Sequence, residues 1–446
     1  MPNKQLIFLK ILLLSFVARF ARGTPERNFG MGGMSTGRVG AMTADPHNPF
    51  AADNNPALMA VGEKPQFAFS FGGGSATVEP SGAVLLDSPT FRTGAGTREV
   101  QGQASLEPMG FSRWSLGMVF PFSLSRYINR QAGLGVTVSG PVGKIRQLQS
   151  LTPYAFQSLH YGAPNDQLKA VVSAGAEIIP NALYFGAGLS FYISAAGAID
   201  AVLLADNPTG RMDMTVSLNS SAILGLYSRW EAAGASLVYR QAANPKFVER
   251  ITGRVEVAEG ARTLDLPFQL QTSLFYEPHR FELDYQQRLG SFHFSVGAVW
   301  ELWSAFEPSF FLVTAEKRGG TRVATQTTEL PFRDTLSPRA SATVSLTRSL
   351  EAGIGYQFRP SPLTDAAASG SANLLDSSTH VLGAAVEYDL GDRAWLPFPL
   401  RLGIFGQFHL LNKREVKKNQ ARYIGAPGYT LGGQAYFVGA QLEGTF

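Results

Sequence analysis

Apolar and polar residues alternate along most of this chain, with a period of two that begins near Pro65 and persists to Phe446. The stretch from Leu350 to Phe358 is typical, because every second residue is apolar and the residues between them are polar or glycine. A period of two places successive side chains on opposite faces of a strand, whereas a helix repeats after about 3.6 residues. The pattern predicts an all-β chain after residue 64.

Alternation also fits a soluble β-sandwich, so strand length and turn spacing decide between the two architectures. The apolar faces run for about ten residues, the length of a tilted membrane strand, and end in aromatic residues such as Tyr356 and Tyr388. Tight turns such as Leu289–Gly290 alternate with longer polar segments such as Ser361–Ser378. We therefore expect a closed antiparallel transmembrane β-barrel of roughly fourteen to sixteen strands, because an open edge in hydrocarbon would leave backbone groups unpaired.

The segment Asn28–Lys64 precedes the first alternating stretch and has a different character. It is rich in Gly, Ala and Asn, and Pro46, Pro49 and Pro56 each interrupt any continuous helix or central strand. Such a segment contains too few large apolar residues for a core of its own. We expect it to be enclosed by the rest of the chain.

Residues 1–23 have the features of a secretory signal peptide. Lys4 precedes an apolar run from Leu6 to Ala18, and Ala21 and Gly23 supply small residues where a signal peptidase cleaves. We expect cleavage after Gly23. The predicted organisation is a signal peptide at 1–23, an N-terminal segment at 24–64 and a transmembrane barrel at 65–446.

Composition narrows the functional classes. Charged residues make up 16% of the chain, below the roughly 25% of soluble domains, and no apolar run after the leader approaches the ~20 residues of a membrane helix. The chain has no cysteine, which excludes disulfides and thiolate chemistry. The net charge of +4 is diffuse, and a nucleic-acid partner does not fit an exported chain. A basic cluster at Lys413–Lys418 is either a solvated loop or a contact for lipopolysaccharide.

Two stretches carry a resemblance to a known family. The first is the spacing Gly-x-x-Gly-Ala-x-x-Ala-Asp from Gly37 to Asp45, followed by Asn-Pro-Ala-Leu at Asn55–Leu58, and the second is the run Gly355–Tyr388. Both resemble FadL-type outer-membrane transporters of hydrophobic compounds. The resemblance implies a barrel of fourteen strands with an N-terminal plug in its lumen, in the outer membrane of a Gram-negative bacterium. It also implies uptake of long-chain fatty acids or aromatic hydrocarbons by plug-gated passive diffusion, without enzymatic turnover.

The residues that carry this resemblance in the N-terminal segment are the candidate plug and gating residues. They are Gly37, Gly40, Asp45, Asn55, Pro56 and Ala57. An Asn side chain can satisfy backbone groups in a turn, Pro fixes φ, and Ala leaves room for close packing. We expect Asn55–Ala57 to pin the exit of the plug to the base of the first strand.

A pathway for hydrophobic solutes needs apolar residues inside an otherwise polar barrel, since each buried methylene is worth about 0.8 kcal/mol. The candidates are Phe29, Met31 and Met34 in the plug and Phe185, Phe275 and Phe405 on the predicted lumen face. Packing of the plug against the wall would explain the same residues. In an early strand, Gly117 and Pro121 could form a kink that opens the wall, or Pro121 could simply end the strand.

The charged and polar residues predicted to face inward are expected to pair with each other, with the plug or with water, or to hold and release the plug. They include Glu282, Asp284, Arg288, His293, Glu301, Glu351, Arg359, Glu387, Asp389, Arg401, Gln407, His409 and Glu443. No His-Glu-x-x-His run occurs, so no metal or cofactor is predicted. Gly33–Gly37 has the letters of a nucleophile elbow but lacks the preceding strand that such a motif needs. No catalytic residue is predicted.

The last strand ends in Phe446, which is typical of the signal read by the barrel-assembly machinery. The other expected partners are a hydrophobic small molecule, outer-membrane lipid and lipopolysaccharide. An alternative function is a structural or secretion-associated barrel that acts as a docking platform. A lipid-modifying enzyme is a further alternative, but His279 has no Ser in register with it.

Overall fold

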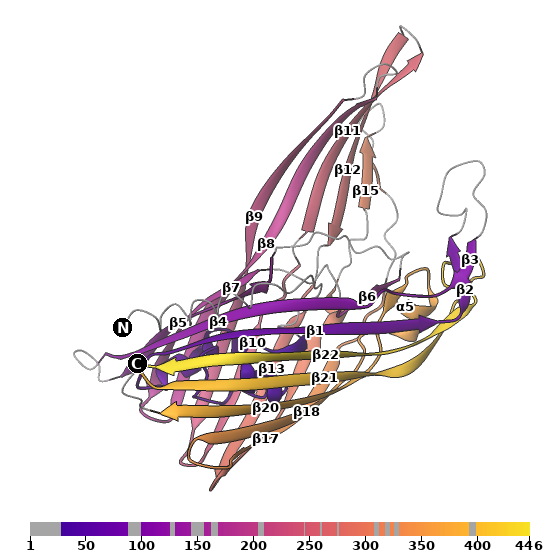
Figure 1. The fold of residues 1–446 in the computed structure, drawn as a ribbon. Coiled ribbons are helices and arrows are strands. Elements are labelled where there is room, and N and C mark those ends of the chain that lie inside the picture. The colour runs from indigo at the N-terminus through magenta and orange to yellow at the C-terminus, as the bar shows by residue number, and fades with distance from the viewer. Residues whose placement is uncertain are drawn as a thin grey trace, which may run out of the picture.

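The computed structural model describes residues 28–87, 100–124, 130–143, 156–161, 168–203, 209–244, 246–258, 261–273, 276–306, 312–316, 322–324, 330–391 and 398–446. The predicted leader and the candidate Phe275 lie outside these residues. Within them, 14 strands form a closed antiparallel barrel (Figure 1). They are β1 (Gln66–Ser81), β4 (Met109–Ser123), β5 (Gln131–Pro141), β7 (Lys169–Ile179), β8 (Leu183–Leu203), β9 (Thr209–Arg229), β10 (Ala233–Arg240), β13 (His279–Leu289), β14 (Phe292–Leu302), β17 (Thr335–Ser345), β18 (Leu350–Arg359), β20 (Thr379–Gly391), β21 (Leu400–Lys417) and β22 (Gly428–Thr445).

The barrel closes between its first and last strands. β1 pairs with β22 on one side and with β4 on the other, so that Gln66 lies opposite both Thr445 and Val119. Closure pairs the backbone N–H and C=O groups of the first and last strands, which would otherwise lie unpaired in hydrocarbon. The predicted closed barrel is confirmed.

The two ends of the barrel differ as predicted. Short turns join β7 to β8, β9 to β10, β13 to β14 and β17 to β18, and Gly290 in the third of these adopts a φ of 62°. The opposite end carries long connections, which contain the hairpin β2 (Ala83–Asp87) and β3 (Val100–Gln103). Two of these connections meet where β6 (Gln157–Ser158) pairs in parallel with β19 (Leu374–Leu375). The C-terminus lies at the short-turn end (Figure 1).

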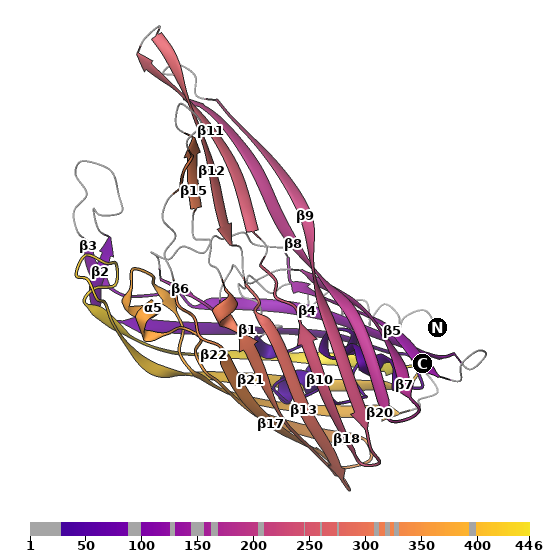
Figure 2. The ribbon, with the colours of Figure 1, turned by 180° about the vertical axis from the view of Figure 1, so that it is seen from behind.

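An extension of the sheet rises from the long-loop end and was not predicted from the sequence. It consists of the far halves of β8 and β9 with β11 (Lys246–Ala258), β12 (Ala261–Ser273), β15 (Leu312–Glu316) and β16 (Arg322–Ala324). β11 runs parallel to β8, with Val248 opposite Ala196. Both ribbon views show the extension projecting away from the barrel (Figure 1, Figure 2).

The alternation of the strands separates an apolar outer face from a polar lumen. On β13, Leu283 is 58% exposed, whereas its neighbours Glu282 and Asp284 are buried. The same alternation on β18 leaves Ile354 63% exposed. Apolar side chains thus face outward, as the outer face of a membrane barrel requires. No helix among the described residues is long and apolar enough to cross a membrane.

The N-terminal segment, defined from here as Asn28–Lys64, is enclosed by the barrel. It contains α3 (Gly33–Gly37), α4 (Ala51–Asn54) and the 3-10 helix η1 (Pro56–Ala60), and most of its side chains are buried. α3 packs against β20 and β21, while η1 packs against β5, β7, β8 and β9. A segment without its own core is stable here because the barrel wall covers it.

Aromatic residues fill the space between the long connections. Tyr276 stacks on Phe306 at a centroid distance of 4.2 Å, and Phe332 packs on both Phe306 and Trp303 of the 3-10 helix η4 (Trp303–Ala305). The helix α5 (Asp365–Ser369) adds two buried alanines to the same cluster. The long-loop end is therefore packed over the lumen.

Candidate transport lumen

Glycines in the barrel wall let the backbone of η1 lie directly against the strands. A Cβ atom at Gly175 would lie 2.4 Å from the Pro56 oxygen, and one at Gly225 would lie 2.0 Å from Asn55 Oδ1. Gly186 meets the same backbone, at 2.2 Å from the Pro56 carbonyl carbon. The backbone of Pro56 leaves no room for a side chain at Gly175 and Gly186, and the side chain of Asn55 occupies that space at Gly225. Sequence reasoning missed these glycines, although glycine within a strand is a known sign of close backbone approach.

A second glycine contact holds α3. A Cβ atom at Gly37 would lie 2.6 Å from the Ala385 nitrogen, and one at Gly383 would lie 2.6 Å from the Gly37 oxygen. Gly355 on β18 faces the backbone of Arg38 in the same way. Gly37, a predicted plug residue, is therefore a point of backbone contact between the N-terminal segment and β20.

Asn55 joins three backbone groups while being fully buried. Its Oδ1 accepts from the Ala57 nitrogen at 3.0 Å and caps η1, whose first residue is Pro56. Its Nδ2 donates to the Thr43 oxygen at 2.7 Å and to the Leu226 oxygen of β9 at 3.3 Å. Asn55–Ala57 thus lie against β7, β8 and β9. The predicted attachment to the base of the first strand is wrong, because the glycines that admit this backbone are on those other strands.

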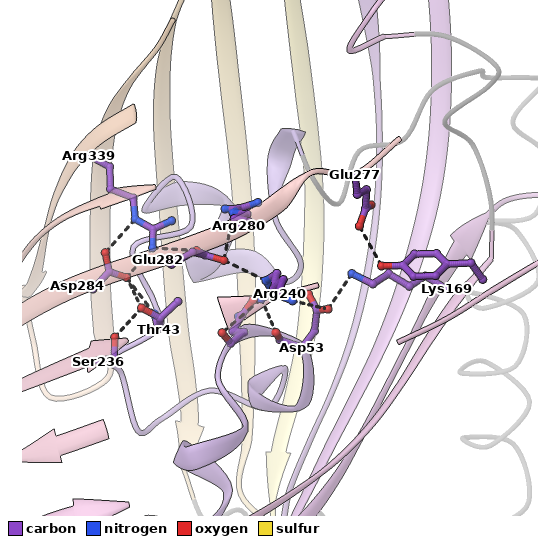
Figure 3. A network of polar contacts seen from close by, with 12 residues as sticks. Thr43, Asp53, Lys169, Ser236, Arg240, Glu277, Arg280, Glu282, Asp284 and Arg339 are labelled. Atoms are coloured by element: carbon purple, nitrogen blue, oxygen red, sulfur yellow. Dashed lines mark hydrogen bonds and ion pairs between the residues drawn. The ribbon is translucent and has the colours of Figure 1, made fainter. Parts of the chain in front are cut away.

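An ionic network connects the middle of the N-terminal segment to the wall (Figure 3). Arg339 of β17 donates to Asp284 at 2.7 Å and to Glu282 at 3.0 Å, and all three side chains are buried. Thr43 Oγ1 donates to Asp284 Oδ2 at 2.5 Å and lies 2.7 Å from Ser236 Oγ. Charged lumen residues therefore pair with each other and with the segment, as one of the two sequence interpretations proposed.

Asp53 of the segment forms ion pairs with two cations of the barrel wall. Lys169 Nζ lies 2.8 Å from Asp53 Oδ1, and Arg240 Nη1 lies 3.2 Å from the same oxygen (Figure 3). Arg240 also donates to the Asn54 carbonyl at 3.3 Å. Burial raises the pKa of Asp53, but the two cations outweigh it and hold the pKa below its ordinary value. Asp53 was not among the predicted plug residues.

Asp45 and Gly40 shape the turn between these contacts. Arg38 Nη1 pairs with Asp45 Oδ2 at 2.5 Å, and Asp45 Oδ1 accepts from the His47 nitrogen at 3.0 Å. Burial opposes ionisation, but Arg38 and His47 leave the pKa of Asp45 lowered. Gly40 has a φ of 77°, in the region that favours glycine. Both predicted residues therefore stabilise the fold of the segment itself.

The predicted pathway residues that the structure describes fall into two groups. Phe29, Met31, Met34 and Phe405 are buried inside the barrel, whereas Phe185 is exposed on its outer face. Phe29 stacks on His409 at 4.3 Å and packs against Phe111 and Phe437 at 5.3 Å each, and Phe405 lies 5.8 Å from Phe437. Met31 and Met34 are buried in the segment as well.

Phe185 lies on the other side of the wall. It is 41% exposed, while its neighbour Tyr184 is buried in the lumen. The assignment of Phe185 to the lumen is wrong, because the register of β8 directs even-numbered residues inward there. An aromatic residue on the outer face is typical of a membrane barrel.

The described pairings show no opening at Gly117 or Pro121. β4 pairs with β5 without a register shift from Arg113 to Ser123, and Pro121 lies opposite Gly133. A Cβ atom at Gly117 would lie 2.5 Å from the Pro49 oxygen. Gly117 therefore admits the N-terminal segment rather than bending the strand, and Pro121 lies near the end of β4.

Two cavities lie on opposite sides of the N-terminal segment. A cavity of about 90 Å³ on the long-loop side is lined by charged residues that include Lys169 and Arg240. A cavity of about 190 Å³ on the short-turn side is lined by residues that include Glu387 and Glu443. Met31 and Ser35 line both. Ser35 lies within α3, not on a turn between a strand and a helix, which does not fit a nucleophile elbow.

No protein-family model and no curated protein matches the sequence. Solved structures do match over almost the whole chain. A FadL homologue of Pseudomonas aeruginosa has a TM-score of 0.56 at 15% identity, covering 96% of this chain and 99% of that one. The toluene transporter TodX of P. putida has a TM-score of 0.51 at 12% identity, covering 94% and 99%. The toluene transporter TbuX of Ralstonia pickettii has a TM-score of 0.50 at 14% identity, covering 94% and 100%. The chain therefore has the fold of FadL-type outer-membrane channels.

Proposed function

We propose that the protein is an outer-membrane channel for the uptake of hydrophobic small molecules, either long-chain fatty acids or aromatic hydrocarbons, by passive diffusion. The observation that carries the proposal is the N-terminal segment, which lies in the lumen between two cavities. The likeness to the toluene transporters TodX and TbuX supports the same class of solute. The mature chain would begin at Thr24, after removal of the leader.

The segment acts as a gate in this proposal, and its two halves are held differently. The half around Asp53 is tied to the wall by buried ion pairs with Lys169 and Arg240. The half around α3 makes no ion pair with the wall among the described residues. It is tied by hydrogen bonds to neutral groups of the wall, from Gln407 Nε2 to the Thr36 oxygen at 2.8 Å, from the Gly33 nitrogen to Gln441 at 2.5 Å and from Arg38 Nε to Ser341 Oγ at 3.2 Å. Single hydrogen bonds are replaced by water at lower cost than buried ion pairs. Rearrangement of the α3 half would therefore join the two cavities while the other half stays anchored.

The test is uptake by cells that depend on this protein. Cells that express it should accumulate labelled oleate or toluene faster than cells with an empty vector, at equal protein levels in the outer membrane. A variant that lacks residues 28–53 should also admit a small hydrophilic antibiotic. Equal rates for both solutes with and without the protein would reject the channel function.

A docking platform remains the second candidate, and the sheet extension favours it. β8, β9, β11 and β12 project beyond the barrel end, where a partner could reach them (Figure 2). This function predicts normal solute uptake without the protein and loss of an associated protein when the extension is removed.

A further inference from the structure

A short connection at the long-loop end touches both the N-terminal segment and the barrel wall. This outer connection, residues 156–161, is the described part of the link between β5 and β7, and its His160 and Tyr161 are buried. The His160 oxygen accepts a hydrogen bond from Asn28 Nδ2 at 2.6 Å, at the start of the segment. Long connections face the outside of the cell in outer-membrane barrels. The segment is therefore held from the outer side as well as by the wall.

A chain of buried hydrogen bonds leads from the outer connection to α3. Arg359 Nη2 lies 3.0 Å from the Tyr161 hydroxyl, which lies 2.7 Å from His409 Nδ1. His409 Nε2 lies 2.7 Å from Gln407 Oε1, and Gln407 Nε2 donates to the Thr36 oxygen of α3 at 2.8 Å. All five residues are buried. The chain therefore connects a loop outside the barrel strands to the N-terminal half of the segment.

The two ends of this chain fix the direction of every hydrogen bond within it. A guanidinium only donates and a carbonyl oxygen only accepts. Gln407 must therefore present its amide nitrogen to Thr36 and its oxygen to His409, which carries its proton on Nε2. His409 Nδ1 then accepts from the Tyr161 hydroxyl, and the Tyr161 oxygen accepts from Arg359. The partner at one ring nitrogen of a histidine sets the tautomer, so Tyr161 decides whether His409 donates to Gln407.

The same cluster holds the start of the segment. Phe29 stacks on His409 at a centroid distance of 4.3 Å, and Arg359 Nη1 donates to Asn28 Oδ1 at 2.8 Å. The ion pairs of Asp53 with the wall involve none of these residues. The outer connection therefore acts on the half of the segment that makes no ion pair with the wall among the described residues.

We propose that the outer connection is a latch, which holds the α3 half of the gate through Tyr161, His409 and Gln407 and releases that half when it is displaced. This inference rests on the proposed channel function and names the contact that regulates the gate. Tyr161 is a positioning residue in this role, because it acts on α3 through two side chains of the wall.

The outer connection is seated by contacts that an apolar solute can replace. Phe156 and Leu159 are partly buried against the apolar cluster of the long-loop end, and Phe156 packs edge-to-face on Tyr429 at 5.2 Å. A ligand shifts an equilibrium only by binding one state better than the other. A solute that occupies the sites of these two side chains binds the displaced connection better than the seated one. Its arrival from outside would therefore open the latch.

The test measures hydrogen exchange in residues 33–41 of the purified full-length protein in detergent, by mass spectrometry. Tyr161→Phe keeps the ring but removes the hydroxyl, and exchange there should become about three- to tenfold faster. Gln407→Met has a similar volume but no donor, and its effect should be similar. Because Tyr161 acts through Gln407, the double variant should exchange no faster than Gln407→Met alone. None of these substitutions alters the segment, so intrinsic exchange rates are unchanged.

Tyr192→Phe is the matched control. Tyr192 is also buried, and its hydroxyl donates to Glu277 at 2.9 Å, a contact that includes no residue of the segment. Exchange in residues 33–41 of this variant should equal that of the unchanged protein.

Three results would overturn the latch even if oleate and toluene uptake is normal. They are unaltered exchange in Tyr161→Phe, equal acceleration by Tyr192→Phe, and additive effects of the Tyr161 and Gln407 substitutions. Accelerated and non-additive exchange, in a protein that takes up neither solute, would retain the latch and reject the channel.

Discussion

At the scale of single residues, glycines and one asparagine decide how the N-terminal segment meets the wall. At the wall glycines Gly175 and Gly186, backbone atoms of Pro56 occupy the space that a side chain would need, and at Gly225 the side chain of Asn55 occupies it. Asn55 then satisfies three backbone groups that have no other side-chain partner at this contact. The segment is therefore positioned by shape and by hydrogen bonds at the same few residues.

Asn55→Leu should loosen the segment without preventing barrel closure. The substitution removes this partner from the buried Thr43 oxygen and Ala57 nitrogen, at a cost of about 1–3 kcal/mol for each, and it also removes the bond to the Leu226 oxygen of β9. We expect faster entry of a small hydrophilic antibiotic at normal barrel levels. Asn54→Leu is the control, since the side-chain amide of Asn54 makes no hydrogen bond to a described residue. Equal leakage from both variants would contradict this role.

Gly186→Ala tests the close approach of the backbone. Its Cβ would lie 2.2 Å from the Pro56 carbonyl carbon, so η1 must move away from β8. Increased protease cleavage within the N-terminal segment of the folded protein should report that movement. Gly62→Ala provides a control within the same segment, because its nearest atom is 3.8 Å away. Identical cleavage patterns for the two variants would show that the wall glycines do not position η1.

At the scale of elements, the barrel is completed by its last strand and covered by its long connections. Phe446 follows β22 and packs on Phe67 at 5.3 Å and on Phe398 at 4.6 Å, so the end of the chain contacts the start of β1. At the other end, the connection between β18 and β20 is held by a buried cluster around Asp376. These two contacts give separate predictions.

Deletion of Phe446, or its replacement by Asp, should block assembly rather than transport. The last strand must be recognised before it can close the barrel against β1, and the aromatic contacts with Phe67 and Phe398 hold its end. The expected result is loss of heat-modifiable migration on gels and loss of outer-membrane protein. Phe446→Tyr, which keeps the ring, should assemble normally. Normal migration of the Phe446→Asp variant would contradict the role of Phe446 in barrel assembly.

Asp376 should make the long connection pH-sensitive. Burial raises the pKa of Asp376 to about 6, although Ser361, Arg359 and Arg414 oppose this shift. A carboxyl whose pKa is raised on folding binds more protons when folded, so its contribution to stability falls as the pH rises from about 4 to 6 and is constant above.

Hydrogen exchange in residues 360–378 should therefore be slower near pH 4.5 than near pH 7, after correction for intrinsic rates. Asp376→Asn removes the titrating group and should abolish the difference. A difference that persists in this variant would assign the effect to another group, such as His160, whose Nε2 lies 3.4 Å from Asp376 Oδ1.

At the scale of the whole molecule, the barrel and the extension are separable. β10 pairs directly with β13 from Ala233 to Arg240, although β11 and β12 lie between them in the sequence. The barrel wall is therefore continuous without the extension, which joins it through β8 and β9.

Replacement of residues 246–273 by a short Gly-Ser linker should leave a closed barrel with normal solute uptake. The bridge between Ala243 and Glu277 already brings the two ends of the removed segment together. Heat-modifiable migration and oleate or toluene uptake provide the measurements. If migration is normal but uptake is lost, the extension takes part in transport.

The alternation of apolar and polar residues, together with strand length and turn spacing, was sufficient to predict the closed barrel, its apolar outer face and its two unlike ends. It was sufficient because side-chain direction along a strand is a local property with a period of two. The small, Gly- and Pro-rich composition of Asn28–Lys64 likewise required an enclosure, which the barrel provides. These predictions needed no knowledge of which strands are neighbours.

Only the tertiary structure decided which residues meet across the lumen. It placed Asn55 against β9 instead of β1, directed Phe185 outward, and brought Asp53 to Lys169 and Arg240. It also showed that Gly117 admits the N-terminal segment and that β8 and β9 continue into an extension. Each of these facts depends on strand register and on contacts between residues far apart in the chain. A shift of one residue reverses the face of every side chain in a strand, so local pattern alone does not determine them.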